Sequence, residues 1–352
     1  MRLFRDHLSK ISGYVPGIQP KNSDFIKLNT NENPYPPSPR VIKALREALN
    51  GSLRLYPDPL SDRLRDRIAE VCALSREWVL VGNGSDEILN WVSRAVLAKG
   101  DELWVTDPTY ILYEVLAQFQ EAKTVRCLLD EKFDLPHRFN LKNAQLIMIS
   151  NPNTPTGTCF DKSKIIKICS STRALVLIDE AYVDFAQCDC IELVKNFKNV
   201  LVTRSFSKSF SLAGMRIGYA VGRPETIGIL MKLKDSYNLN RLSQAAALAA
   251  LNDMAWMKEN VERIIRDRFF LSENLSKLGF HVLPSQANFI FAAHKNFGAK
   301  WLYERLYERK FLVRHFELPR LENYLRISIG THLEMVKLVG LIRELTKGGG
   351  KL

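Results

Sequence analysis

The chain has 352 residues, of which 46% are hydrophobic, and it carries a formal net charge of +12 from 50 basic and 38 acidic residues. Its length suits one large and one small domain, and no apolar run is long enough to cross a bilayer, which excludes a membrane protein. The basic residues are spread along the chain without a block of like charges, so we expect small-molecule partners and no nucleic acid.

The cysteine pattern and the N-terminal residues bear on the cell compartment. Six cysteines are scattered along the chain: Cys72, Cys127, Cys159, Cys169, Cys188 and Cys190. Such scattering predicts reduced thiols, and the spacing fits neither a disulfide framework nor a zinc site, so no metal is expected. The charged N-terminal stretch lacks the apolar segment of a secretory signal, which favours a cytoplasmic enzyme.

The first half of the chain predicts an α/β domain. Residues 1–35 are rich in Pro, Gly and Asn and are expected to form an irregular N-terminal arm. Amphipathic helices are expected at 38–50, 60–73, 85–100 and 109–119. Short apolar runs predict strands at 78–81, 102–106, 124–129, 145–150, 174–179 and 199–203. Apolar runs without alternation suit strands buried on both faces, and their alternation with helices predicts a mainly parallel sheet in a large domain over 36–235.

The pattern changes after about residue 235. A long helix is expected at 254–278 and a closing helix at 332–346. Between them, strands are expected at 281–283, 288–291, 311–314 and 325–330. These elements predict a smaller α+β domain over 236–352.

The strongest chemical signal is the segment 205–219, SFSKSFSLAGMRIGY, directly after the strand 199–203. Its lysine, Lys208, is expected at the carboxyl end of a sheet strand, where open α/β sheets bind ligands, and its amine can form an imine with an aldehyde cofactor. The hydroxyls of Ser205 and Ser207 and the guanidinium of Arg216 suit a phosphate ester. Taken alone, Lys208 would more often be an ordinary surface lysine.

Two further strand ends carry polar residues. The turn 82–87, GNGSDE, opens a helix whose free N–H groups can bind a phosphate, although many such turns are only helix caps. Asp179 ends the strand 174–179 and is followed by Tyr182. A carboxylate in a pocket of low dielectric can hold a pyridine nitrogen in its cationic form, and Tyr182 can donate to a phenolate oxygen. A Walker-B-like acidic strand end is the other interpretation, but the chain has no P-loop.

Two turns complete the pattern. NPNTPTG at 151–157 follows the strand 145–150 and forms a rigid turn at the sheet edge. Tyr110, in DPTY after the strand 102–106, can stack on a planar ring, although an isolated tyrosine there more often only packs.

Taken together, these segments resemble the fold-type I enzymes that depend on pyridoxal 5'-phosphate, in the class I/II aminotransferase family. GNGSDE, DPTY, NPNTPTG, DEAY, SFSKSFSLAGMRIGY and LRISIG occur here in the order of that family, over nearly the whole chain. The resemblance implies a fold-type I transferase with a mainly parallel large domain and a small C-terminal domain.

The resemblance also implies a role for each cofactor-binding residue. Lys208 is expected to hold the cofactor as a Schiff base and to shuttle the proton, Asp179 to pair with the pyridine nitrogen and Tyr182 to contact the phenolate oxygen. Tyr110 is expected to stack on the ring. The phosphate is expected among Ser85, Asp86, Ser205, Ser207 and Arg216, partly through backbone donors. Tyr56 is expected to reach the phosphate of the neighbouring subunit, which implies a homodimer with shared active sites.

Within the family, SGYVPG, LNTNENPYPPSP and LYPDP are similar to the subfamily that acts on L-histidinol phosphate. That similarity implies transamination with 2-oxoglutarate, giving imidazole-acetol phosphate and glutamate in histidine biosynthesis. Arg326 is then expected to pair with a substrate α-carboxylate, and Tyr14, Asn31 and Arg314 to lie toward the distal end of the substrate. An aminotransferase for aromatic or other amino acids and a threonine-phosphate decarboxylase stay open as alternatives, and a basic nucleic-acid-binding protein is the remote one.

Two positions depart from the family pattern. The residue before Pro-Thr-Gly is usually an Asn that donates to the phenolate oxygen, and here it is Thr154, a donor with a shorter reach. Pro36 stands where the subfamily usually has Gly. The first change leaves more of the contact with the phenolate oxygen to Tyr182.

Overall fold

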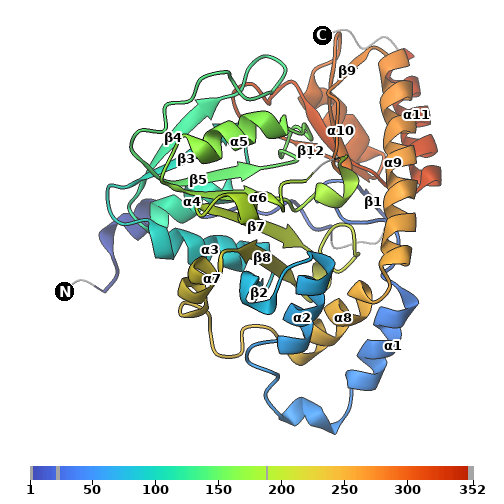
Figure 1. The fold of residues 1–352 in the computed structure, drawn as a ribbon. Helices are drawn as coiled ribbons and strands as arrows, with labels where there is room; N and C mark the ends of the chain where they lie inside the picture. Colours follow the sequence, from blue (N-terminus) through green and yellow to red (C-terminus); the bar gives the residue numbers. More distant parts are fainter. Residues whose placement is uncertain (1–2, 21–23, 188, 348–352) are drawn as a thin grey trace.

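The computed structural model describes residues 3–20, 24–187 and 189–347. Its largest feature is a seven-stranded sheet with the strand order β2–β8–β7–β6–β5–β3–β4 (Figure 1). The strands are β2 (Val79–Gly82), β3 (Glu102–Asp107), β4 (Lys123–Leu128), β5 (Ala144–Ser150), β6 (Leu175–Asp179), β7 (Val200–Ser205) and β8 (Gly218–Gly222). Within this sheet β8 alone runs in the direction opposite to the other strands. The prediction of a mainly parallel sheet is therefore confirmed.

Helices cover both faces of the large sheet. They are α1 (Pro39–Ala48), α2 (Asp62–Val71), α3 (Ser85–Val96), α4 (Leu112–Phe119), α5 (Lys162–Ser170), α6 (Leu193–Asn196), α7 (Pro224–Met231) and α8 (Arg241–Leu251). Side chains of α2, α5, α6 and α8 share one core with the sheet, and those of α3, α4 and α7 share the other. In β6, Val176 and Ile178 face the first core and Leu177 the second. Two buried faces explain why these strands read as unbroken apolar runs.

A second, antiparallel sheet lies toward the C-terminus, with the strand order β12–β13–β10–β9. Its elements are β9 (Phe280–Val282), β10 (Phe289–His294), β12 (Arg314–His315) and β13 (Leu325–Ser328), with the helices α9 (Met254–Lys277), α10 (Ala299–Glu308) and α11 (His332–Lys347). Figure 1 shows α9 and α11 side by side along the edge of the molecule. Their apolar faces join a third core with β10 and β13.

The predicted strand 311–314 is wrong in one respect, because the chain changes sheets within it. Phe311–Leu312 forms β11 and pairs in parallel with β1 (Ile26–Lys27), whereas β12 pairs with β13. Phe311, Leu312 and Val313 are buried, whereas Arg314, the first residue of β12, is half-buried.

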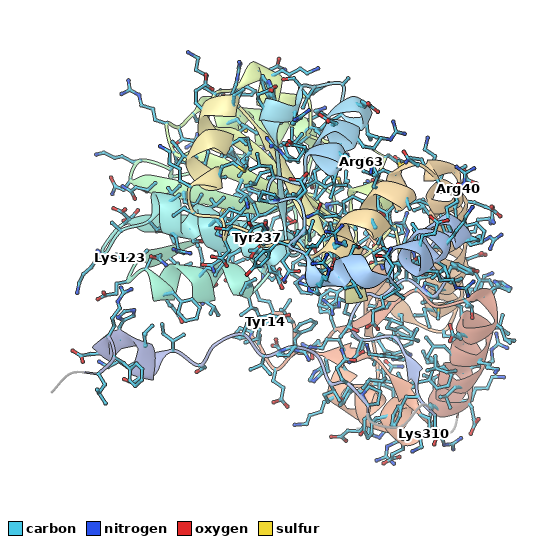
Figure 2. All side chains as sticks on the ribbon, turned by 90° about the horizontal axis from the view of Figure 1, so that it is seen from below. Tyr14, Arg40, Arg63, Lys123, Tyr237 and Lys310 are labelled. Carbon is cyan, nitrogen blue, oxygen red and sulfur yellow. The ribbon has the colours of Figure 1, made fainter. Side chains whose placement is uncertain are left out.

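The N-terminal arm is less irregular than expected. It contains a 3-10 helix, η1 (Asp6–Lys10), and the strand β1, and Leu28 is buried in the core of the C-terminal elements. Figure 2 shows Tyr14 on the stretch that runs between η1 and the small sheet. The other short helices are η2 (Gly51–Arg54), η3 (Arg76–Trp78), η4 (Val183–Phe185) and η5 (Ala213–Met215). The division at residues 35 and 235 stays a prediction.

Three further observations concern the residues that the structure describes. None of their helices combines the length and the hydropathy needed to cross a membrane. No group of three or more of their His, Cys, Asp or Glu side chains is placed to hold a metal ion. Cys72, Cys127 and Cys169 are free thiols, and Cys188 lies outside the described residues.

Candidate active site

A cavity of about 750 Å³ lies between the large sheet and the C-terminal elements. Its wall contains all the predicted site residues except Tyr56. They are Tyr14, Asn31, Ser85, Asp86, Tyr110, Thr154, Asp179, Tyr182, Ser205, Ser207, Lys208, Arg216, Arg314 and Arg326. The sequence motifs, although separated by up to hundreds of residues, therefore meet in one place.

Strand direction explains this convergence. Ser150, Asp179 and Ser205 are the last residues of β5, β6 and β7. These neighbouring strands are parallel, and Ser150 pairs in register with Asp179. Parallel strands deliver their carboxyl ends to one sheet edge, where ligands bind in this class of fold.

Lys208 presents an uncommitted amine to the cavity. Its Nζ donates to the carbonyl oxygen of Thr30 at 3.3 Å and lies 5.8 Å from the ring centroid of Tyr182. Among the described residues it has no carboxylate within ion-pair distance. An amine held by a single backbone contact can be redirected toward an electrophile at low cost.

Asp179 is a buried carboxylate, with 4% of its surface exposed. Its Oδ2 accepts from the Tyr113 hydroxyl at 2.8 Å, and its Oδ1 accepts from the Ala181 N–H at 3.2 Å and the Thr203 hydroxyl at 3.4 Å. Burial raises the pKa of Asp179, and these three hydrogen bonds lower it. Because burial has the larger effect, the resulting pKa is about 6. A positive charge brought into the cavity beside this carboxylate would be strongly attracted.

Tyr182 and Asn31 form one buried unit. Asn31 Nδ2 donates to the Tyr182 hydroxyl at 3.0 Å, and Asn31 Oδ1 accepts from Ser328 Oγ at 2.9 Å. Asn31 has a φ of 56°, a left-handed conformation that asparagine tolerates better than most residues. Asn31 therefore lies beside Tyr182. Its expected contact with the distal end of the substrate stays a prediction.

One end of the cavity is built for an anion. Helix α3 begins at Ser85 after Gly84, which provides no side-chain cap, so the first N–H groups of the helix are not satisfied by a cap. The backbone there is tightly packed. A Cβ on Gly218 would lie 2.3 Å from the Ser85 nitrogen, and one on Gly84 would lie 2.6 Å from Arg216 Nη2. The hydroxyl of Ser205 accepts from the Ser207 N–H at 3.1 Å in the same region.

Asp86 connects this end to the tyrosine beside it. Arg216 Nη2 donates to Asp86 Oδ2 at 3.2 Å, and the Tyr110 hydroxyl donates to Asp86 Oδ1 at 3.4 Å. The Tyr110 ring makes edge contacts with Tyr14 and Tyr113, each with ring centroids 5.5 Å apart. The Asp86 carboxylate thus orients the Arg216 guanidinium and the Tyr110 ring. A phosphate in direct contact with this carboxylate would be repelled by its negative charge.

Two arginines line the opposite side of the cavity. Arg314 and Arg326 are directly paired in the antiparallel strands β12 and β13, so both side chains lie on one face of the small sheet. Arg326 donates to Thr154 Oγ1 at 3.3 Å and to the Asn29 carbonyl at 2.8 Å, while its Nε is buried without a partner among the described residues. Burial lowers the pKa of Arg326, but a guanidinium stays charged in proteins.

The turn at 151–157 places Thr154 and Asn153 differently. Thr154 lines the cavity. Asn153 is fully buried and donates to the Pro108 carbonyl and to Thr156 Oγ1, at 3.2 and 2.9 Å. Asn153 is therefore used inside the turn and does not replace the asparagine that the family usually has at position 154.

Tyr56 lies outside the cavity. It is 75% exposed and stacks on Tyr237, with ring centroids 4.3 Å apart. Its expected contact with a second subunit stays a prediction.

Sequence reasoning missed Tyr113. This residue contacts Asp179 from α4, and in the sequence it is one more aromatic residue on an apolar helix face. Only the crossing of α4 over the sheet reveals its partner, so the sequence held no signal for it.

Comparisons with known proteins give a consistent result. The family model for aminotransferase class I and II matches residues 23–342. The histidinol-phosphate aminotransferase of Citrifermentans bemidjiense is 44% identical, covering 99% of this chain and 100% of the relative. That of Geobacter sulfurreducens is 41% identical, covering 97% and 99%.

Solved structures share the fold. The histidinol-phosphate aminotransferase of Sinorhizobium meliloti, in complex with pyridoxal-5'-phosphate, has a TM-score of 0.88 at 24% identity and covers 99% of this chain and 98% of its own. The L-threonine-O-3-phosphate decarboxylase of Porphyromonas gingivalis has a TM-score of 0.82 at 22% identity and covers 92% and 99%. At these identities the likeness extends to the fold and no further.

Proposed function

We propose that this chain, which belongs to the aminotransferase class I and II family, transfers the amino group of L-histidinol phosphate to 2-oxoglutarate. The products are imidazole-acetol phosphate and glutamate, and the reaction belongs to histidine biosynthesis. The observation that carries this proposal is the identity of 41–44%, over nearly the whole chain, to relatives named histidinol-phosphate aminotransferase.

The donor set of the cavity fits the family's cofactor, pyridoxal 5'-phosphate. We assign the phosphate to the start of α3 with Ser205, Ser207 and Arg216, because this end combines open N–H groups, hydroxyls and a guanidinium. We assign the pyridine nitrogen to Asp179, a buried carboxylate without a cationic partner among the described residues. When bound, the cofactor supplies an electron sink for the bond cleaved at the substrate carbon.

The remaining cofactor contacts follow from the same arrangement. In this proposal Tyr110 packs against the ring, and Tyr182, oriented by Asn31, donates to the phenolate oxygen. Thr154 stands where the family usually has a longer donor. Asp86 serves the phosphate through the backbone of α3 and by orienting Arg216.

Lys208 carries the proton chemistry in the proposed reaction. Its Nζ would hold the cofactor through the aldehyde group. As a free amine beside a bound substrate, Lys208 would act as the general base that removes the proton from the carbon bearing the substrate nitrogen, and it would return that proton to complete the transfer of the amino group. Arg326, on β13 of the small sheet, forms part of the wall of the same cavity.

The two arginines suit both substrates. L-Histidinol phosphate has a phosphate at one end, beyond the carbon that replaces the α-carboxyl group, and no α-carboxylate, whereas glutamate has carboxylates at both ends. We propose that Arg326 binds the α-carboxylate and Arg314 the distal anion, because they lie on one face of the cavity wall. Tyr14, which lines the cavity beside Tyr110, is proposed to contact the distal part of the substrate.

A half-reaction tests the function directly. Cofactor-loaded enzyme is mixed with L-histidinol phosphate, L-phenylalanine or O-phospho-L-threonine, and the cofactor absorbance is followed together with release of CO2. We expect the fastest conversion with L-histidinol phosphate and no CO2 from any substrate. Faster conversion of phenylalanine, or CO2 from the phosphothreonine, would contradict the proposal.

We also propose a homodimer with shared active sites and a cytoplasmic location. The exposed Tyr56, held by its stacking on Tyr237, is available to a second subunit. The free thiols of Cys72, Cys127 and Cys169 suit a reducing compartment. The proposed domains are an arm over 1–35, a cofactor-binding domain over 36–235 and a small domain over 236–352. The core that α9, α10 and α11 form with the small sheet supports the division, while α8 packs with the large sheet.

A further inference from the structure

Tyr113 occupies an unusual position for a core aromatic residue. It lies on α4, is completely buried, and donates its hydroxyl proton to Asp179 Oδ2 at 2.8 Å. Its ring packs within the core between α3, α4 and the large sheet. Its hydroxyl therefore lies at the edge of an apolar core, where it donates to Asp179 and also interacts with Ser150.

The acceptor sites of Asp179 show what this contact does. An ionised carboxylate has about four acceptor positions. Ala181 and Thr203 donate to Oδ1 at 3.2 and 3.4 Å, and Tyr113 makes the shortest contact, on the other oxygen. With both oxygens held, the carboxylate plane cannot rotate freely, and one acceptor position stays open on a side chain that lines the cavity.

Asp179 depends on these neutral donors for its charge. No described arginine, lysine or histidine lies within ion-pair distance of it, and the negative charge of Asp86 on α3 raises its pKa further. Burial raises the pKa of Asp179, and the hydrogen bond from Tyr113 is the largest effect that opposes the rise.

The position of Tyr113 is also coupled to Tyr110. The two belong to one short segment at the start of α4, where the Tyr113 N–H donates to the Tyr110 carbonyl at 3.1 Å. Their rings meet edge to face with centroids 5.5 Å apart. The segment thus fixes the spacing between the ring of Tyr110 at the cavity and the hydroxyl that orients Asp179.

We propose that Tyr113 is a positioning residue that acts through Asp179. Its hydroxyl aims the carboxylate into the cavity and keeps it ionised, so that Asp179 can hold the pyridine nitrogen of the cofactor in its cationic form. This inference rests on the proposed function, since it assigns a role within the same site.

Three variants test the inference. Tyr113→Phe removes the hydroxyl and keeps the ring, Thr203→Val removes the longer hydrogen bond to Oδ1, and Tyr324→Phe is the control. Tyr324 stacks on Phe291 with centroids 4.6 Å apart and does not contact Asp179. For each variant we would measure the ionisation of Asp179 in the apoenzyme by isotope-edited infrared spectroscopy, the dissociation constant of the cofactor, and kcat with several amino donors.

We expect Tyr113→Phe to raise the pKa of Asp179 by about one pH unit, to weaken cofactor binding roughly tenfold and to lower kcat for all donors alike. Thr203→Val should have a smaller effect, and Tyr324→Phe none. An unchanged Asp179 pKa and dissociation constant in Tyr113→Phe would overturn the inference, as would equal changes in Tyr324→Phe. A third outcome is that Tyr113→Phe shows both the raised pKa of Asp179 and the weaker cofactor binding in an enzyme whose wild type converts a different donor. In that case the inference about Tyr113 stands and the proposed substrate is wrong.

Discussion

Removal of the Arg314 guanidinium should lower kcat/KM for a phosphorylated substrate far more than for its unphosphorylated counterpart. Arg314 lines the cavity, and its guanidinium carbon lies 5.3 Å from the ring centroid of Phe316. Among the described residues it has no ion-pair partner. Directly opposite Arg326, it experiences repulsion that a bound anion would relieve. Its charge is therefore available to a ligand and is not committed to the fold.

The size of the effect follows from this environment. A hydrogen bond to a charged group typically contributes about 1.5–3 kcal/mol, which corresponds to about 10- to 100-fold in specificity. Arg314 is half-buried, so solvent screening places the expected loss nearer the lower limit. Arg314→Ala should thus lower kcat/KM for L-histidinol phosphate by at least about tenfold, mainly through KM, and should change kcat/KM for L-histidinol far less.

The assay compares both substrates in the wild type, in Arg314→Ala and in Arg309→Ala. Arg309 is exposed, forms an ion pair with Glu344 at 3.4 Å and lies outside the cavity. Its replacement by Ala lowers the net charge by the same amount as Arg314→Ala does. The control should match the wild type, which excludes a general effect of the +12 charge. Equal losses for the two substrates in Arg314→Ala would refute the assignment of the distal anion to Arg314.

Three further predictions concern the cofactor site and the subunits. Borohydride reduction of the holoenzyme should label only the peptide that contains Lys208, and Lys208→Ala should bind the cofactor without completing transamination; a label elsewhere would contradict the attachment point. Mixed dimers of Lys208→Ala and Tyr56→Phe chains should be more active than either parent, since one of the two shared sites carries neither change; no recovery after confirmed subunit exchange would argue against shared sites. Because the pKa of Asp179 is raised to about 6 in the folded state, the unfolded chain ionises first as pH rises from about 4, so Asp179 lowers apoenzyme stability progressively up to pH 6. Apo Asp179→Asn should therefore be up to about 3 kcal/mol more stable than the wild-type apoenzyme at pH 7.5 and nearly equal to it at pH 4, as measured by urea unfolding; the same difference at both pH values would contradict this origin.

Strand ends were the most predictable part of the site. Asp179 and Ser205 follow buried apolar runs, and parallel strands must deliver such positions to one edge, so local sequence was enough to bring them together. The proximity of Arg314 and Arg326 could also be predicted from the sequence, because a single loop joins two strands that pair in antiparallel register.

Other features depend on contacts that local sequence does not encode. The partner of Tyr113 is set by how α4 packs beside β3 and β4, and an aromatic residue on an apolar helix face gives no sign of it. The antiparallel strand β8 was not among the predicted strands, because Gly218–Gly222 is short and continues the lysine motif without a turn signal. The change of partners at Val313 places one apolar run in two sheets, and its pairing partners, β1 and β13, are not marked by the run itself.

The hydrogen bond between Asn31 and Ser328 also has a consequence for folding during synthesis of the chain. The Asn31 N–H donates to Ser328 Oγ at 2.9 Å across 297 residues of sequence, and Ile26 of β1 pairs with Phe311. At about 5–20 residues per second, the ribosome needs roughly 15–60 s to make that intervening chain. The contacts of Asn31 with Ser328 and of β1 with β11 must wait for this time, while the large sheet can already form around β5, β6 and β7. These early residues therefore complete their contacts on a nascent chain only when the last strands, which carry Arg314 and Arg326, have been made.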